Sequence, residues 1–315
     1  MSINYRVISA IIILLSLALV SCVSKEKKEQ GNESAVLSGD KFTIPDIPLL
    51  LNTQEQQAMF LVEHYWDNFN FEDSSALKSH ENVERIFVDY LFILDQVNAE
   101  KSSKGISSLI SKASVNSSIS SYFFEMAEKY LYNPNSPVRN EFLYEEFLKG
   151  ALTSKQIDPV IKIRYQYQFD TAQKNKPGNI ATDFYYTLKD GTVSSLYKIQ
   201  AKKLILYFHN PDCPECKISR GKMVDSQIIQ QLTGNNELKI LAIYPDKELE
   251  LWHSHYDEFP VSWINSYDKE TVIMDEEIYD LKAIPTLYLL DYDKTVIFRD
   301  PTIEQIENYL MSLYN

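Results

Sequence analysis

Through the first half of the chain, apolar residues recur every three or four positions, whereas in the second half they gather in short uninterrupted runs. The first pattern is typical of amphipathic helices with one buried face. Ser136-Pro137 adds a helix start, because serine caps helices and proline suits the first turn. We therefore predict a helical domain over residues 51–172, with its apolar and aromatic stripes in the core. Its expected helices lie within residues 58–65, 83–97, 119–131, 136–147 and 157–169.

A polar segment at residues 174–178, which ends in Pro177-Gly178, marks the boundary between the two patterns. Beyond it, apolar runs of strand length alternate with helical patterns, an order that predicts a sheet covered by helices on both faces. Thr302 and Gln305 form a capping-box pattern that opens the last helix. We therefore predict an α/β domain over residues 178–315. Its expected strands are residues 203–208, 238–244, 286–290 and 295–298, and its earlier helices lie near 217–232 and 276–282.

The N-terminus carries a targeting pattern. Residues 7–20 form an apolar segment after a single basic residue, Arg6, and this segment is shorter than the roughly 20 residues needed to span a bilayer. It ends in Leu19-Val20-Ser21-Cys22, which resembles the lipobox of bacterial lipoproteins. That resemblance implies removal of residues 1–21 as a signal peptide and acylation of Cys22, which would anchor the chain in a membrane. An ordinary signal peptide with a chance cysteine is the alternative.

The segment after Cys22 lacks apolar periodicity and is rich in Lys, Glu, Ser and Gly. We expect residues 22–50 to form a solvated tether between the membrane and the folded domains. The expected location is the bacterial cell envelope, with the chain lipid-anchored to a membrane and its folded domains in the periplasm.

Composition narrows the possible functions further. The 315 residues carry a formal net charge of −13 and have a pI near 4.9, which argues against a general nucleic-acid binder. The eight glycines form neither G-x-G-x-x-G nor a phosphate loop, which excludes nucleotide chemistry through those motifs. The three cysteines are an odd number for an exported chain. If Cys22 carries lipid, Cys213 and Cys216 have no other cysteine to compete for them.

The candidate chemistry lies in Cys213-Pro214-Glu215-Cys216, which follows the expected strand 203–208 and begins a helix. At a helix N-terminus, unpaired backbone N–H groups and the positive end of the helix dipole favour a thiolate, the attacking species in disulfide exchange. A second thiol one turn further on can displace the mixed disulfide. Pro214 suits the first helical turn, where its missing N–H costs no hydrogen bond. We therefore assign the attack to Cys213 and the resolution to Cys216.

Three motifs together resemble the thioredoxin superfamily, and within it the TlpA-like group of envelope thiol–disulfide proteins. They are Ala181-Thr182-Asp183-Phe184 with Asp190-Gly191, the motif from Cys213 to Cys216, and Ala283-Ile284-Pro285-Thr286 before a Leu-rich run. The resemblance covers residues 178–315 and implies a central mixed β-sheet with helices on both faces. It also implies a Cys213–Cys216 pair that cycles between dithiol and disulfide. Finally, it implies a cis peptide bond before Pro285, with Pro285, Ile284 and Pro214 shaping substrate docking.

The same resemblance implies an activity: thiol–disulfide exchange with protein thiols and disulfides. It further implies a redox donor in the envelope, and neither a metal nor an organic cofactor. The helical half resembles an uncharacterised domain family that precedes such modules in envelope lipoproteins, which adds architecture but no activity. The expected partners are therefore protein thiols and disulfides, the donor, and the membrane through the lipid anchor, without nucleic acid or nucleotide.

Departures from the family pattern favour the reducing direction. Asp212 replaces the tryptophan that precedes the first cysteine in the family, and Tyr207 stands where thioredoxin itself often has a buried acid. Asp212 and Glu215 oppose a thiolate on the attacking sulfur, whereas Lys217 and His209 are expected to favour one. Strong oxidants have an unusually stabilised reduced form, so we expect a reductase rather than an oxidase.

Metal binding and peroxidase chemistry fit the residues less well. A CxxC is half of a zinc site, but there is no second CxxC. The spacing of the close histidine pair, His253 and His255, points the two rings to different sides of a helix. Peroxiredoxins, by resemblance, need a threonine three residues before the attacking cysteine, where this chain has Asn210. The other histidines that could complete a zinc site are His64, His80 and His209.

One alternative from another class stays open. The chain could be a lipid-anchored binding or scaffold protein, with a helical half that grips a partner. Its thioredoxin-like half would then be ancillary or hold a structural disulfide. A pair that cycles between dithiol and disulfide favours the enzyme, whereas a permanently oxidised pair favours the scaffold.

Overall fold

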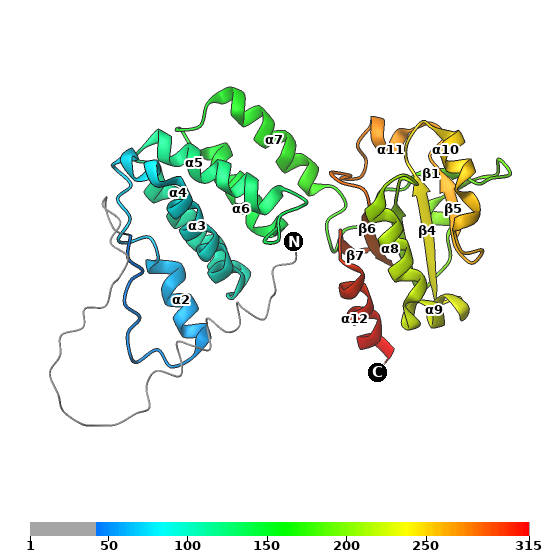
Figure 1. Cartoon of the computed structure of the whole chain (residues 1–315), viewed down its shortest axis with the longest axis horizontal. Helices are drawn as coiled ribbons and strands as arrows, with labels where there is room; N and C mark the ends of the chain where they lie inside the picture. The colour runs from blue at the N-terminus through cyan, green and yellow to red at the C-terminus, as the bar shows by residue number, and fades with distance from the viewer. Residues whose placement is uncertain (1–41, 315) are drawn as a thin grey trace. The chain divides into compact units, whose positions relative to one another are not determined.

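The computed structural model describes residues 42–314, in which a helical part (residues 42–173) precedes an α/β part (residues 178–314) (Figure 1). This order confirms the predicted fold class. The expected signal peptide and Cys22 lie outside the described residues, as does the tether up to residue 41. Among the described residues, no helix is both long enough and apolar enough to cross a membrane.

Amphipathic helices form the helical part, and their apolar faces meet in one core. Trp66 lies near its centre, with ring centroids 5.4 Å from Tyr90 and 5.1 Å from Phe123 in edge-to-face contacts. The aromatic stripes therefore lie in the core, as their spacing predicts. The helices are α2 (Gln54–His64), α3 (His80–Asp95), α4 (Ala99–Ala113), α5 (Ser117–Ala127), α6 (Glu141–Thr153) and α7 (Pro159–Gln173), with a 3-10 helix η1 (Ser74–Ser79) and a π-helical turn η2 (Glu128–Tyr132).

The start of α6 corrects one expectation. Ser136-Pro137 does not open this helix, which begins at Glu141 after the N-cap Asn140. The Asn140 side-chain oxygen accepts a hydrogen bond from the backbone N–H of Leu143 at 3.1 Å. Asparagine is an N-cap as good as serine, and here it lies directly before the first buried turn of the helix.

The sheet of the α/β part has seven strands in the order β2-β1-β5-β4-β3-β6-β7. The pairs β3–β4 and β4–β5 are parallel and the remaining pairs are antiparallel, so the sheet is mixed, as the resemblance implies. The strands are β1 (Tyr185–Thr187), β2 (Val193–Ser195), β3 (Lys203–Phe208), β4 (Leu238–Tyr244), β5 (Ile264–Tyr267), β6 (Thr286–Asp291) and β7 (Val296–Arg299).

Alternate residues of β3 point into two different cores, because side chains alternate along a strand. Ile205 and Tyr207 belong to the core beneath α8 (Pro214–Asp225), α9 (Gln227–Gly234) and α12 (Ile303–Tyr314). Leu204 and Leu206 belong to the opposite core. Both faces of the sheet are therefore covered. The shorter helices are α10 (Leu249–Ser254) and α11 (Val272–Asp275), with 3-10 turns η3 (Leu196–Lys198) and η4 (Tyr256–Glu258).

The predicted strands are confirmed to within a residue at each end, and the capping box of α12 is present. The backbone N–H of Thr302 donates to Gln305 Oε1 at 2.8 Å, and the backbone N–H of Gln305 donates to Thr302 Oγ1 at 3.1 Å. The helix expected over residues 217–232 is instead two helices that meet at Ser226. The Ser226 hydroxyl accepts a hydrogen bond from the backbone N–H of Ile229 and so begins α9.

The helix expected over residues 276–282 is absent from the described fold, because its backbone carbonyls are bonded elsewhere. The Lys174 ammonium and the Asn175 side-chain amide donate to the carbonyls of Glu277 and Ile278, each at 2.7 Å. Tyr279 is buried and its hydroxyl donates to the carbonyl of Thr182 at 2.6 Å. The segment is therefore an irregular loop that leads to Pro285.

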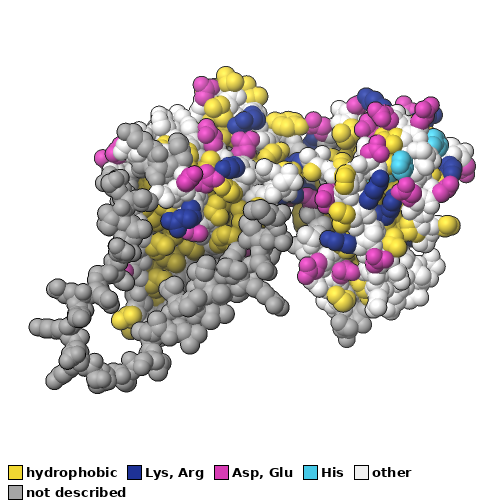
Figure 2. Space-filling model, in the orientation of Figure 1, with side chains coloured by type: hydrophobic (Ala, Val, Ile, Leu, Met, Phe, Trp, Pro, Cys, Tyr) yellow, Lys and Arg dark blue, Asp and Glu magenta, His cyan; other side chains and the backbone are white. Residues whose placement is uncertain are grey.

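On the face of the α/β part seen in Figure 2, acidic and basic side chains are interspersed.

Candidate active site

Cys213 lies at the N-cap of α8, after a short loop that begins where β3 ends. Its backbone is extended, and Pro214 occupies the first turn of the helix as predicted. The Cys213 sulfur is half-buried and accepts a hydrogen bond from the backbone N–H of Cys216 at 3.4 Å. A helix N-terminus with a free N–H directed at the sulfur favours the thiolate.

Cys216 lies one turn further into α8 and is only 3% exposed. The backbone N–H of Asn210 points at its sulfur at 3.5 Å. Burial raises the pKa of the Cys216 thiol well above its ordinary value, despite that N–H. Both cysteines are free thiols here, so the Cys213–Cys216 disulfide stays a prediction. The outer sulfur is accessible and the inner one is buried and protonated.

The peptide bond between Ile284 and Pro285 is cis, as the resemblance implies. The Cys213 thiol donates to the Ile284 carbonyl at 3.3 Å, so the loop before Pro285 touches the attacking sulfur. The sheet register explains this contact, because Phe208 at the end of β3 pairs with Thr286 at the start of β6. The structure thus brings together Cys213, Cys216, Pro214, Ile284 and Pro285, whose roles remain predictions.

Tyr207, in β3, forms a hydrogen bond with the first turn of α8. Its hydroxyl donates to the backbone carbonyl of Cys216 at 2.6 Å, and its ring stacks on that of His209 at 5.2 Å between centroids. Burial, chiefly, raises the Tyr207 pKa far above its ordinary value, so the residue stays neutral. In the position where thioredoxin often carries a buried acid, this chain therefore has a neutral hydrogen-bond donor.

His209 corrects an expectation about charge. Its ring is 1% exposed and lies 4.7 Å from that of Phe259, and its Nε2 has no hydrogen-bond partner among the described residues. Burial, with a smaller contribution from Arg220, lowers the pKa of His209 from 6.5 to about 3. The imidazole is therefore neutral near neutral pH and does not favour a thiolate through charge.

Arg220 is a residue that the sequence analysis missed. It lies four residues after Cys216 on α8, which places both on one face of the helix. Its guanidinium lies 4.7 Å from the ring centroid of Phe259 and forms an ion pair with Glu258 at 2.5 Å. The i, i+4 spacing from Cys216 on the predicted helix is the signal that could have placed Arg220 near the site. Asp212 and Glu215, by contrast, are exposed.

The described residues show no group of three His, Cys, Asp or Glu side chains that could hold a metal ion. His64 contacts Asp67 at 2.8 Å in the helical part, away from the cysteines. His253 lies in the last turn of the short helix α10 and is exposed. The site is therefore a dithiol next to a loop backbone.

Comparison with known proteins places both parts of the chain. Residues 21–175 match the family model "Domain of unknown function (DUF5106)". A thioredoxin-like protein from Bacteroides caccae, solved as a crystal structure, is 42% identical, covers 86% of this chain and 98% of its own, and superimposes with a TM-score of 0.84.

Two further crystal structures cover less of the chain. The C-terminal domain of an uncharacterized protein from Bacteroides fragilis is 43% identical over 44% of this chain and 98% of its own, with a TM-score of 0.43. A conserved protein of unknown function from the same species is 34% identical over 43% of this chain and 98% of its own, with a TM-score of 0.42. No curated protein matches the chain. The chain belongs to the thioredoxin-like proteins, with a DUF5106 domain in its N-terminal region.

Proposed function

We propose that this protein is a membrane-anchored thiol–disulfide oxidoreductase of the bacterial envelope, which reduces disulfides in protein substrates. The observation that carries the proposal is the contrast between its two thiols. Cys213 is half-exposed at the start of a helix, whereas Cys216 is buried one turn further on. An accessible attacking sulfur and a shielded resolving sulfur are what exchange through a mixed disulfide requires.

The proposed reaction has two displacements. The Cys213 thiolate attacks one sulfur of the substrate disulfide and forms a new S–S bond, and the other substrate sulfur leaves as a thiolate. Cys216 then gives up its proton to a leaving thiolate and attacks the Cys213 sulfur, which releases the second substrate sulfur. Two electrons pass from the dithiol to the substrate, and the protein is left with a Cys213–Cys216 disulfide. A dithiol donor of the envelope must return those electrons.

Substrate docking is assigned to the backbone of Ile284, flanked by Pro285 and Pro214. Support comes from the 3.3 Å contact between the Cys213 sulfur and the Ile284 carbonyl. An extended substrate chain that pairs with this backbone would bring its disulfide next to Cys213.

The reducing direction is proposed from the charges that surround the attacking cysteine. Asp212 and Glu215 are exposed beside the attacking cysteine, and His209 is uncharged. The Ile284 carbonyl accepts a hydrogen bond from the Cys213 thiol at 3.3 Å. Strong oxidants depend on a stabilised reduced form, so this environment fits a reductase better.

Reduction of insulin disulfides by the purified chain, with dithiothreitol as donor, tests the activity. Wild type should accelerate insulin reduction and Cys213→Ser should abolish the acceleration, while Cys22→Ser, a matched cysteine control, should retain it. Equal rates for wild type and Cys213→Ser would contradict the proposal. Alkylation of Cys213 and Cys216 before and after treatment with reductant tests the scaffold alternative. That alternative requires a permanently oxidised pair, whereas the enzyme requires a pair that cycles between dithiol and disulfide.

Membrane anchoring through Cys22 is a separate proposal that rests on the segment Leu19-Val20-Ser21-Cys22. In the native host, wild type should sediment with membranes and incorporate labelled palmitate. Cys22→Ser should lose the label and leave the membrane fraction. A Cys22→Ser chain that stays membrane-bound and acylated would contradict the anchor.

A further inference from the structure

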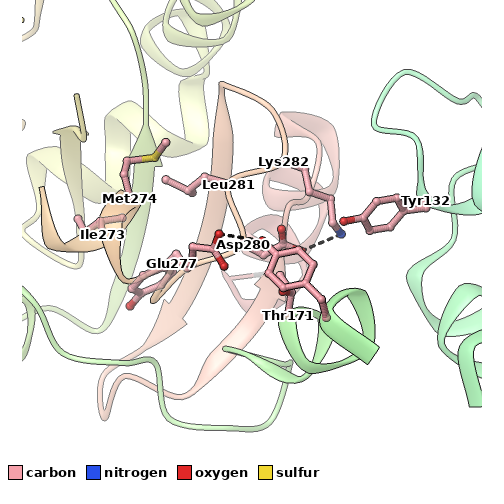
Figure 3. Close-up of a pocket in the computed structure, with 10 residues that line it drawn as sticks. Tyr132, Thr171, Ile273, Met274, Glu277, Asp280, Leu281 and Lys282 are labelled. Atoms are coloured by element: carbon pink, nitrogen blue, oxygen red, sulfur yellow. Dashed lines mark hydrogen bonds and ion pairs between the residues drawn. The ribbon is translucent and has the colours of Figure 1, made fainter. Parts of the chain in front are cut away.

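The loop that leads to Pro285 contacts the helical part through Lys282. The Lys282 ammonium lies 2.7 Å from Asp280 Oδ2, 3.4 Å from Glu141 Oε1 in α6, and 4.4 Å from the ring centroid of Tyr132 in η2. The side chain is 12% exposed, which is unusually low for a lysine. Figure 3 shows the Lys282 ammonium directed toward Tyr132. Both residues line a cavity of about 220 Å³.

The partners of Lys282 in the helical part are themselves held in place. Arg299 Nε donates to Glu141 Oε2 at 2.7 Å, and Arg139 Nη2 donates to Glu141 Oε1 at 2.9 Å. Burial acts to raise the pKa of Glu141, but Arg299, Lys282 and Arg139 together hold it below its ordinary value, so the carboxylate is charged. The ring of Tyr132 packs on that of Tyr144 in α6, with 4.9 Å between centroids. Lys282 therefore contacts a carboxylate, Glu141, and an aromatic ring, Tyr132, that are both held in place by neighbouring side chains.

Ile284, the residue that touches the attacking sulfur, lies two residues after Lys282. Two extended residues span at most about 7 Å, so a fixed Lys282 leaves the Ile284 backbone little freedom. From Phe42 onward the chain forms one compact unit, which includes both ends of this connection. The same loop therefore contacts the helical part at one residue and Cys213 at another.

We infer that Lys282 is a positioning residue, through which the DUF5106 domain holds the substrate-docking backbone of Ile284 beside Cys213. The inference rests on the proposed disulfide exchange. It assigns the helical part a share in substrate binding, although that part contributes no group to the chemical step.

In the competing interpretation, the ion pairs of Lys282 only stabilise the fold. A comparison of a protein disulfide with a small disulfide as substrates distinguishes the two interpretations. A protein disulfide needs the Ile284 backbone for docking, whereas a small disulfide such as hydroxyethyl disulfide reacts with Cys213 without it. Loss of positioning should therefore impair only the protein substrate, and should do so through KM.

The experiment uses the full chain and its Lys282→Met variant with both substrates. For insulin we expect KM to rise about tenfold while kcat is retained, the pattern of lost binding rather than lost transition-state stabilisation. For hydroxyethyl disulfide, kcat/KM should be unchanged. Lys282→Arg, which keeps the charge over the Tyr132 ring, should restore most of the insulin KM.

Lys203→Met is the matched control. Lys203 is 13% exposed and pairs with Asp291 at 2.8 Å, at the end of β3 opposite the cysteines, so this variant should keep the wild-type insulin KM. An unchanged insulin KM in Lys282→Met, or equal losses with both disulfides, would overturn the inference.

If Lys282→Met does not fold, the same measurements are made on Tyr132→Leu. This variant removes the aromatic ring and keeps the ion pairs of Lys282 with Asp280 and Glu141. The same selective rise of the insulin KM is expected, and its absence would overturn the inference. A wild-type protein no more active than Cys213→Ser would instead reject the proposed function itself.

Discussion

The pKa of Cys216 is raised by burial, so at neutral pH the resolving thiol is protonated. Only the thiolate attacks a mixed disulfide, and its fraction grows about tenfold per pH unit below the pKa. The step that releases the substrate should therefore accelerate steadily as pH rises. With a thionitrobenzoate adduct on Cys213, release of the chromophore measures that step directly.

We expect the release rate to rise throughout the range from about pH 6 to pH 9, as the thiolate fraction requires. Cys216→Ser should show no release and serves as the control. A rate that is flat across this range would mean that Cys216 is already ionised, contrary to its burial.

His209 links the site to acid stability. Its folded-state pKa is about 3, below the 6.5 of the exposed ring, so below pH 6.5 the unfolded chain binds a proton that the folded chain does not. The stability due to neutral His209 is complete above pH 6.5 and is lost as pH falls toward 3. In that window the free energy of unfolding should fall by about 1.4 kcal/mol per pH unit because of this residue alone.

Urea unfolding of wild type and His209→Phe across this window checks the linkage. Below pH 6.5 the free energy of unfolding should fall less steeply with pH in His209→Phe than in wild type. Above about pH 7.5, where the wild-type imidazole is neutral in both the folded and the unfolded state, the two proteins should show the same pH dependence. Identical slopes below pH 6 would contradict a buried neutral imidazole.

The site was predictable from the sequence where the chemistry is local. A strand followed by Cys213 and Cys216 at a helix start, and Ile284-Pro285 before another strand, can be read from the residues in order. The ring contacts of His209 with Tyr207 and Phe259 could not be predicted in this way. His209 and Phe259 belong to segments that come together only in the folded domain. The neutral state of His209 follows from that packing and not from its position.

At the scale of elements, α4 packs closely against its neighbours because it carries Gly105. A Cβ added there would lie 2.7 Å from both Tyr90 Oη and Val62 Cγ1, and 3.0 Å from Leu94 Cδ2. Gly105→Ala should therefore destabilise the protein by about 1–3 kcal/mol through overpacking. Chemical denaturation measures the change.

Gly221 in α8 provides the control with the opposite sign. Nothing lies within 4 Å of a Cβ added there, so Gly221→Ala should stabilise the protein by roughly 0.5–1 kcal/mol through helix propensity. Destabilisation by both variants, or by neither, would contradict the close packing at Gly105.

Helix α4 was not among the predicted elements, although the sequence carries its signal. Its buried residues Ile106, Leu109 and Ala113 recur at helical spacing among serines and lysines. Long stripes, as in α3 and α5, predict their helices well because every turn carries an apolar residue. The loop over residues 276–282 has a helical pattern but lacks the helix, since side chains from residues 174 and 175 bond its carbonyls.

At the scale of the whole molecule, Arg299 joins β7 to the helical part. Its side chain is 3% exposed, bonds Glu141 through Nε at 2.7 Å, and donates to the carbonyls of Ala172 and Lys174 at 2.7 and 3.1 Å. Removing one partner of a buried charge cluster leaves the others uncompensated. Arg299→Met should therefore cost about 3–5 kcal/mol.

Urea unfolding followed by fluorescence measures that cost. Arg85→Met is the control, since Arg85 is 70% exposed and its ion pair with Asp89 spans 4.0 Å, so the change should stay below about 1 kcal/mol. Comparable effects from the two arginines would contradict a buried junction. Sequence alone could not indicate this junction, because its charges come from residues more than a hundred positions apart.

The central claim, that Cys213 attacks and Cys216 resolves, is tested most directly by trapping the mixed disulfide. Cys216→Ser, incubated with an oxidised protein substrate, should accumulate a covalent adduct that reductant dissolves and that maps to Cys213 by mass spectrometry. Cys213→Ser should accumulate none, because Cys216 is buried. Adducts on Cys216 in the Cys213→Ser protein, or none on Cys213 in Cys216→Ser, would contradict the assignment.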